Sequence, residues 1–97
     1  MESAYEECLY YELEKYDLVV EKQKPLPLIY EDVKLDAGYR IDLLIDEKFI
    51  VEIKAVGNGL CEDNYRQTVN YMRASGCKLA LLVNFGKKGL QHKRFVL

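Results

Sequence analysis

GYRIDLLIDEKFIVEIKAV, residues 38–56, reads as two β-strands joined by a tight turn at residues 46–48. The two strands, residues 39–45 and 49–56, are rich in Ile, Leu and Val, as β-strands are. Charged residues nevertheless lie in the middle of both strands: Asp42, Glu52 and Lys54. Because burying an unpaired charge is costly, each of them must be paired, solvated or bound to a metal ion.

Side-chain alternation along the two strands brings the charges together. Glu52 and Lys54 are two residues apart and share a face, whereas Ile53 points to the other face, which is expected to be core. If the turn has three residues centred on Glu47, Asp42 lies directly opposite Glu52. Two carboxylates so close repel each other and favour a cation between them, with Lys54 beside it. A two-residue turn would place Asp42 opposite Ile53 instead, so the predicted site depends on the turn.

The spacing Asp42-x9-Glu52-x-Lys54 on adjacent strands resembles the pattern of the PD-(D/E)XK phosphodiesterase superfamily. More closely, the chain looks like the small GxxExxY proteins within that superfamily. The triplet alone occurs by chance, but the resemblance extends over nearly the whole chain, in the blocks ESAY (2–5), GYRIDLLI (38–45), FIVEIKAV (49–56), YRQTVNYM (65–72) and GCKLALLVNFG (76–86). It implies an α/β fold with an αβββαβ restriction-endonuclease-like core, in which two helices flank a mixed sheet, over one domain at residues 1–97.

The resemblance also implies a set of metal ligands. Asp42, Glu52 and the backbone carbonyl of Ile53 would hold Mg²⁺, a hard cation suited to oxygen ligands, with Mn²⁺ as a possible substitute. Lys54 would orient the attacking water or help to deprotonate it. These expectations favour a metal-dependent phosphodiesterase, although a charged cluster can also be a satisfied ion network with a structural role.

Two further contributions follow from the resemblance. Glu2, from the ExxY pair with Tyr5, would point from the first helix towards the metal; equally, a glutamate at a helix N-terminus is favoured by the helix dipole. Gln67 and Tyr71 match the Gln-x-x-x-Tyr pair of RecB-like nucleases, which reaches the active site. Four residues apart on a helix, they are neighbours, but an exposed glutamine beside a half-buried tyrosine would show the same spacing.

Hydrophobic periodicity and turn residues predict the other elements. A helix is expected at residues 3–16, followed by extended chain that Pro25 and Pro27 restrict to a sheet edge or a bend. A second helix at residues 62–75 ends at Gly76. The apolar run that follows it predicts a buried strand parallel to residues 49–56. The remaining short strands are expected at residues 18–20, 26–30, 33–35 and 94–96.

Composition limits the class of protein. The chain has 97 residues and a net charge of −2, which argues against gripping nucleic acid by bulk electrostatics alone. A homodimer could provide a larger binding surface. An odd number of distant cysteines (Cys8, Cys61 and Cys77) favours a reducing, cytoplasmic location over a disulfide framework. No apolar run approaches the roughly 20 residues of a membrane span, and no secretory leader is visible.

Three function classes therefore remain open, the last of them a structural subunit in which Asp42, Glu52 and Lys54 form a satisfied ion network. The first is a nuclease that hydrolyses nucleic-acid phosphodiester bonds, with DNA favoured over RNA as its partner. The second is a non-catalytic nuclease-like module that binds nucleic acid or a protein. The intact set of Asp42, Glu52 and Lys54 favours the nuclease, since a module that only binds would not need all three.

Overall fold

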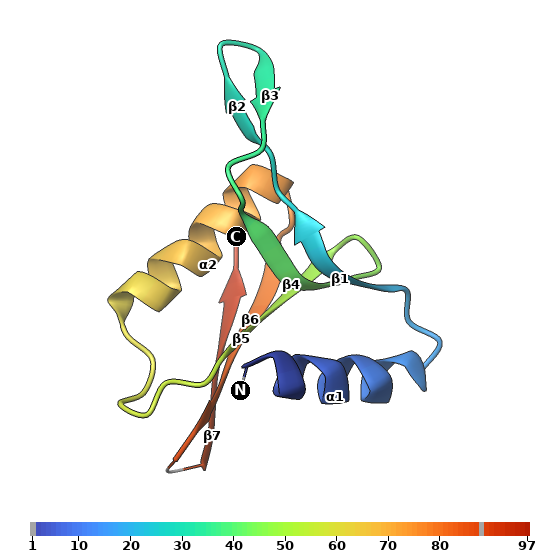
Figure 1. Ribbon diagram of the computed structural model, residues 1–97, viewed down its shortest axis with the longest axis vertical. Helices are drawn as coiled ribbons and strands as arrows, with labels where there is room; N and C mark the ends of the chain where they lie inside the picture. Colours follow the sequence, from blue (N-terminus) through green and yellow to red (C-terminus); the bar gives the residue numbers. More distant parts are fainter. Residues whose placement is uncertain (1, 88) are drawn as a thin grey trace.

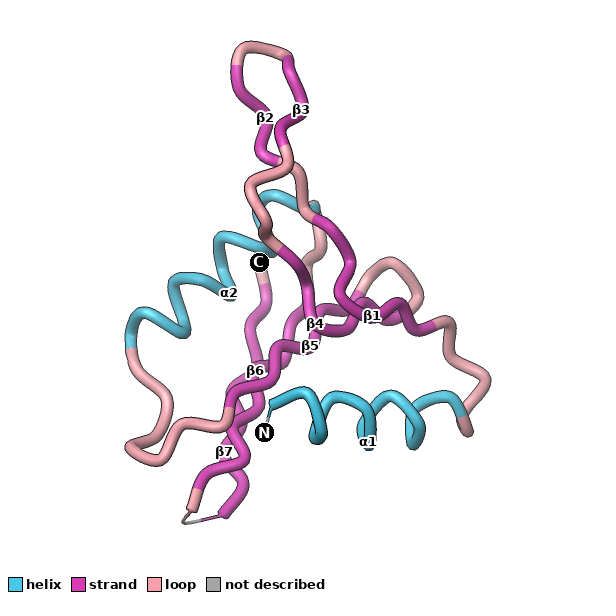
Figure 2. The backbone as a smooth tube through the Cα atoms, in the orientation of Figure 1, coloured by secondary structure: helices cyan, strands magenta, loops and turns pink. Residues whose placement is uncertain are grey.

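A five-stranded sheet lies between two helices, and a two-stranded arm projects from one end of the molecule (Figures 1 and 2). The computed structural model describes residues 2–87 and 89–97. Met1 and Lys88 lie outside the described residues. Within the described ranges, no helix is long and apolar enough to cross a membrane.

The helices and strands follow the predicted order αβββαβ, with an arm inserted and a strand added at the end. They are α1 (Glu2–Glu14), β1 (Val20–Pro25), β2 (Leu28–Tyr30), β3 (Val33–Leu35), β4 (Arg40–Ile45), β5 (Phe49–Lys54), α2 (Glu62–Ser75), β6 (Leu79–Gly86) and β7 (Gly89–Val96). The mixed α/β architecture expected from the sequence is thereby confirmed. The last strand is longer than the predicted residues 94–96, because it pairs with the full length of β6.

The sheet has the strand order β1-β4-β5-β6-β7. β5 and β6 run parallel, as predicted from the helix between them, and the other neighbours are antiparallel. β5 therefore lies at the centre, with hydrogen-bonded neighbours on both sides. Pro25 closes β1 at the edge of the sheet, where a missing N–H costs no ladder bond.

The turn between β4 and β5 has the three residues that the predicted site requires. Ile45 pairs with Phe49, so that residues 46–48 form the connection. Asp46 and Glu47 have φ angles of 51° and 58°, in the left-handed region that tight turns use. Asp46 is also anchored to Val19, whose backbone N–H donates to Asp46 Oδ1 (3.0 Å).

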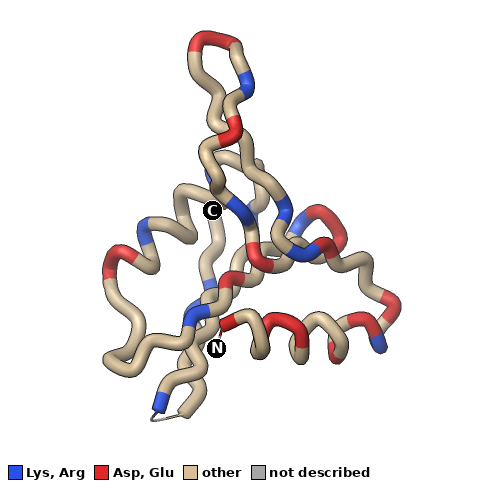
Figure 3. Tube along the Cα trace, in the orientation of Figure 1, with Lys and Arg blue, Asp and Glu red and all other residues tan. Residues whose placement is uncertain are grey.

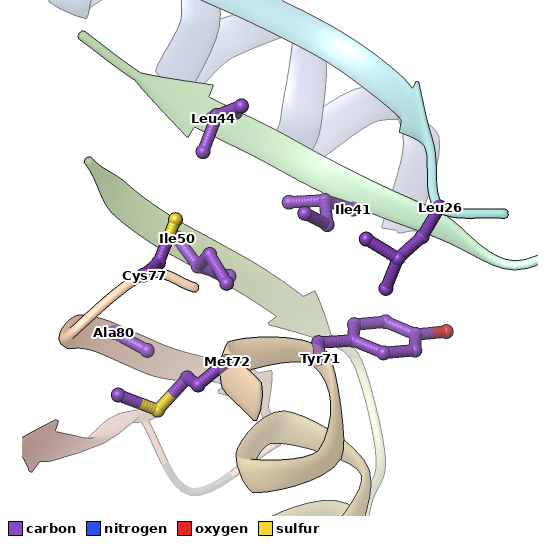
Figure 4. Packing of buried hydrophobic residues seen from close by; sticks show 8 residues of the cluster. All are labelled: Leu26, Ile41, Leu44, Ile50, Tyr71, Met72, Cys77 and Ala80. Carbon is purple, nitrogen blue, oxygen red and sulfur yellow. The ribbon is translucent and has the colours of Figure 1, made fainter. Parts of the chain in front are cut away.

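Apolar side chains are buried on both faces of the sheet. On one face Ile50 and Leu44 pack against Met72 and Tyr71 of α2 (Figure 4). On the other, Val51 and Ile53 belong to a cluster covered by half-buried residues of α1: Tyr5, Leu9, Tyr10 and Leu13. The sequence predicted core on the Val51 face only. The face that carries Glu52 is core as well, because α2 covers it.

The arm formed by β2 and β3 is separate from the main sheet. All six of its strand residues are exposed, although most are apolar. At its base, Asp36 Oδ1 accepts a hydrogen bond from the N–H of Gly38 (2.9 Å), which closes the turn into β4. The strands of the arm therefore contribute no buried residue to the core.

Candidate active site

The predicted site lies where β4 and β5 stop pairing. Their ladder ends at Leu43 and Val51, and the same register carried one residue further places Asp42 opposite Glu52. Instead of a strand partner, the backbone N–H of Ile53 donates to Asp42 Oδ2 (2.8 Å). The carboxylate of Asp42 thus lies in the gap between the two strands. The three-residue turn confirms the register on which this arrangement depends.

A distortion on the other side of β4 brings a second acid close to Asp42. Gln23 lies opposite Asp42 in the register of β1 and β4, but the two do not pair, and Gln23 has a φ of 51°. Its side-chain amide donates one hydrogen bond to Asp42 Oδ1 (3.2 Å) and one to Glu6 Oε1 (2.8 Å). Burial raises the pKa of Glu6, and the nearby charge of Asp42 adds to this effect.

Sequence analysis missed Glu6 and Gln23. Glu6 follows Glu2 by four residues, so both lie on neighbouring positions of one side of α1. Glu2, the residue that the resemblance selected, is exposed in the first turn. Its role stays a prediction. The i, i+4 spacing was a signal for Glu6, whereas Gln23 is found only once β1 is aligned with β4.

Glu52 is the most buried charged residue of the site. It is only 3% exposed, and its Oε1 atom has no hydrogen-bond partner among the described residues. Burial, reinforced by the charge of Asp42, raises its pKa to about 9, and Lys54 opposes this rise. Without a bound cation, Glu52 therefore holds a proton at neutral pH, because the charge of Lys54 only partly offsets the cost of burying the ionised form.

Lys54 ends β5 on the same face as Glu52. Its side chain is half-buried, and its charge lowers the pKa of Glu52, which places the ammonium within electrostatic range of the carboxyl group. The chain just after β5 is held by Asn84, whose side chain makes hydrogen bonds of 2.8 and 3.0 Å to the N–H and carbonyl of Val56. The end of β5 is therefore fixed against β6.

Helix α2 brings the predicted glutamine and tyrosine to the site. Gln67 Nε2 donates to the hydroxyl oxygen of Tyr71 (3.3 Å), as expected for residues four apart. Burial raises the pKa of Tyr71, with the charge of Glu52 as the next cause. The helix is fixed by Cys61, whose N–H donates to Asn64 Oδ1 (2.9 Å), and by Gly76 with a φ of 80°.

The ligand set suits a hard divalent cation. Among residues 2–87 and 89–97, no group of three or more His, Cys, Asp or Glu side chains lies close enough together to hold a metal ion. Asp42 and Glu52 offer two carboxylates, and Mg²⁺ is commonly held by one or two carboxylates together with waters and substrate phosphate. The unpartnered Oε1 of Glu52 fits a bound divalent cation, because a buried acceptor needs a donor or a cation. The carbonyl of Ile53 faces the same gap as its N–H, since both groups of a strand residue point to the same neighbour.

Comparison with known proteins assigns the chain to a superfamily. The family model described as the PD-(D/E)XK nuclease superfamily matches residues 1–95. The match includes both helices and the hairpin that carries Asp42, Glu52 and Lys54. Neither the curated proteins nor the solved structures give a match.

Proposed function

Because the chain belongs to the PD-(D/E)XK nuclease superfamily, we propose that it is a Mg²⁺-dependent nuclease of the GxxExxY type, organised as one domain over residues 1–97. Its active site, formed by Asp42, Glu52 and Lys54, hydrolyses phosphodiester bonds, and Mn²⁺ can replace Mg²⁺ there. The observation that carries this proposal is the buried, unpartnered Oε1 of Glu52 beside Asp42, in a gap between two strands.

Asp42 and Glu52 would hold the cation, together with the backbone carbonyl of Ile53. When bound, a divalent cation lowers the pKa of water and offsets negative charge that develops on the phosphate. The chain's own contribution is to orient Asp42 and to leave Oε1 of Glu52 without a hydrogen-bond partner among the described residues. Ile53 N–H and Gln23 fix the orientation of Asp42, and Glu6 fixes Gln23 in turn.

The remaining residues would act on water and phosphate. Lys54 presents an ammonium beside Glu52, where it orients the attacking water or helps its deprotonation by stabilising the hydroxide that forms. The amide of Gln67 can hold a phosphate oxygen. Tyr71 keeps its hydroxyl proton because its pKa is raised, so it is available as a hydrogen-bond donor. Glu2 would assist catalysis from the first turn of α1.

The proposed substrate is nucleic acid, with DNA favoured over RNA. The net charge of −2 argues against a broad electrostatic grip, and Lys22, Lys24, Arg40 and Arg66 form ion pairs with acids. A homodimer would enlarge the binding surface. The same charges favour the second candidate, a nuclease-like module that binds a partner without cutting it.

Calorimetry with Mg²⁺ and Mn²⁺ would test the proposal, with cleavage of DNA and RNA measured on the same samples. The wild type is expected to bind metal and cut, whereas Asp42→Asn should lose both activities while remaining folded. Glu12→Gln is the control, since it removes an exposed acid of α1 that pairs only with Lys15. Metal binding without cleavage would favour the second candidate. Absence of metal binding at millimolar concentrations would overturn both the metal site and the nuclease.

A further inference from the structure

A groove of about 450 Å³ runs between α2 and the base of the β2–β3 arm. We call it the α2 groove; its lining includes Leu26, Pro27, Tyr39, Asn70, Tyr71 and Ala74. Figure 1 shows the base of the arm above the C-terminal end of α2. The groove is thus formed by two segments that are far apart in the sequence and that meet beside β4.

The walls of the α2 groove are aromatic and apolar. The rings of Tyr39 and Tyr71 lie with centroids 6.4 Å apart and planes tilted by 56°. Tyr39 is 49% exposed, so much of its ring is free to contact a ligand, and Leu26 adds an apolar side (Figure 4). Such walls suit a flat, apolar-faced group of the size of a nucleobase.

The rim of the α2 groove is polar. Asn70, Gln67 and Arg66 lie along it on α2, and Asn70 is exposed. Amide side chains can both donate and accept hydrogen bonds, which matches the mixed polar edge of a base. The combination of stacking walls and an amide rim distinguishes this groove from a purely apolar contact surface.

The α2 groove shares two residues with the candidate active site. Gln67 and Tyr71 line the groove and are joined by a hydrogen bond of 3.3 Å, and Tyr71 belongs to the same buried cluster as Ile50, which lies two residues before Glu52 on β5. We propose that the α2 groove binds an unstacked nucleobase next to the phosphate that is cut, so that the enzyme acts on single-stranded or locally unpaired nucleic acid. This inference rests on the proposed nuclease function. A base within an intact duplex cannot enter the groove without leaving its stack, which costs free energy.

Binding measurements separate the base from the phosphate. The probe is a short, fluorescein-labelled single-stranded DNA, compared by anisotropy in Ca²⁺ with the same strand carrying abasic sites at its centre. Both strands have the same phosphates, so a difference in affinity reports the bases. Wild type is expected to bind the abasic strand about fivefold to a hundredfold more weakly, the range typical of one stacked base.

Two variants and one control locate the effect. Ala74→Trp fills the groove from an exposed position on α2, and Tyr39→Ala removes one wall. Both should bind the normal strand as weakly as the wild type binds the abasic strand, with no further loss on the abasic strand. Ala4→Trp places the same indole on an exposed position of α1 and should behave as the wild type. Circular dichroism checks that each variant is folded.

The outcomes distinguish the two proposals. Equal affinity of the wild type for normal and abasic strands, or equal binding of a blunt duplex, would overturn the nucleobase groove even if Mg²⁺-dependent cleavage is observed. Base-dependent binding that Ala74→Trp abolishes, without cleavage, would support the groove and contradict the nuclease. Absence of any binding to nucleic acid would overturn both.

Discussion

Glu52 concentrates the electrostatic cost of this fold in one side chain. The strand around it is almost fully buried, and the charge that acts on it most strongly, that of Asp42, has the same sign. A residue chosen for stability alone would be apolar at this position, as its neighbours Val51 and Ile53 are. The cost is explained if a cation compensates the charge during function, and it makes the stability of the metal-free protein depend on pH.

The free energy of unfolding of the metal-free protein should fall as pH rises. The pKa of Glu52 is about 9 in the folded chain and 4.5 when unperturbed, so between these values the folded state binds one more proton than the unfolded state. The loss should amount to at most about 1.4 kcal/mol per pH unit, and it should cease above the folded pKa. Urea denaturation in EDTA at several pH values measures it. Glu52→Gln should remove this slope, whereas Glu12→Gln should retain it; equal slopes in all three proteins would contradict the prediction.

Asn84 fixes the chain where β5 leaves the active site. It is 1% exposed, and its amide pairs with both backbone groups of Val56 and with Gln91 Oε1 (3.0 Å). Asn84→Ala would leave the N–H and carbonyl of Val56 without these partners. The expected loss is about 2–3 kcal/mol in the free energy of unfolding, since each unsatisfied buried group costs about 1–3 kcal/mol.

Chemical denaturation of Asn84→Ala and of the control Asn58→Ala measures this loss. Asn58 is exposed in the loop that follows Val56, so its removal should change the free energy of unfolding by less than about 0.5 kcal/mol. Asn84→Asp should be at least as destabilising as Asn84→Ala, because it buries an unpaired negative charge against the carbonyl oxygen of Val56. Equal stability of Asn84→Ala and Asn58→Ala would show that water replaces the amide.

At the scale of elements, the β2–β3 arm should be dispensable for stability. None of its strand residues is buried, and it pairs with no strand of the main sheet. Replacing residues 29–34 by Asn-Gly joins Leu28 to Leu35, which already face each other, through a two-residue turn. The free energy of unfolding should change by less than about 1 kcal/mol.

Thermal and urea unfolding of the shortened protein test this prediction. Leu44→Ala is the comparison, because it removes a buried side chain of β4 and should cost about 2–5 kcal/mol. A loss in the shortened protein as large as that of Leu44→Ala would mean that the arm supports the sheet. Leu28 and Tyr39 remain in the shortened chain, so the α2 groove keeps both residues.

The elements themselves were largely predictable from the sequence. Helix α2 has the predicted bounds because its periodicity, acidic start and terminal Gly76 agree, and the three-residue turn at Glu47 set the register of the central hairpin. Two features were not predictable. Burial of the face of β5 that carries Glu52 depends on how α2 packs. The meeting of Glu6 with Gln23 depends on the docking of α1 and on a local distortion of β1, and no short-range pattern encodes either.

At the scale of the whole molecule, the distribution of charge does not favour a broad nucleic-acid-binding surface. Figure 3 shows acidic residues along α1, which lies below the sheet. Several lysines and arginines are paired with acids, and Lys22 and Lys15 are also placed over tyrosine rings of α1. Lys54 is the cation whose charge lowers the pKa of Glu52. Binding should therefore depend on the site and the α2 groove more than on overall attraction.

The salt dependence of binding should accordingly be shallow. Each phosphate contact with a single strand contributes about −0.7 to the slope of log K against log salt, so one to three contacts predict a slope of about −1 to −2. Anisotropy titrations of the single-stranded DNA in Ca²⁺ at several KCl concentrations measure it. Lys54→Gln should make the slope shallower by roughly one contact, about 0.7, whereas Lys15→Gln, in the turn that follows α1, should leave it unchanged. A slope steeper than about −4 would contradict binding by a single protein chain through one to three phosphate contacts. If that slope also became shallower on dilution of the protein, a second copy of the chain would be supplying the additional phosphate contacts.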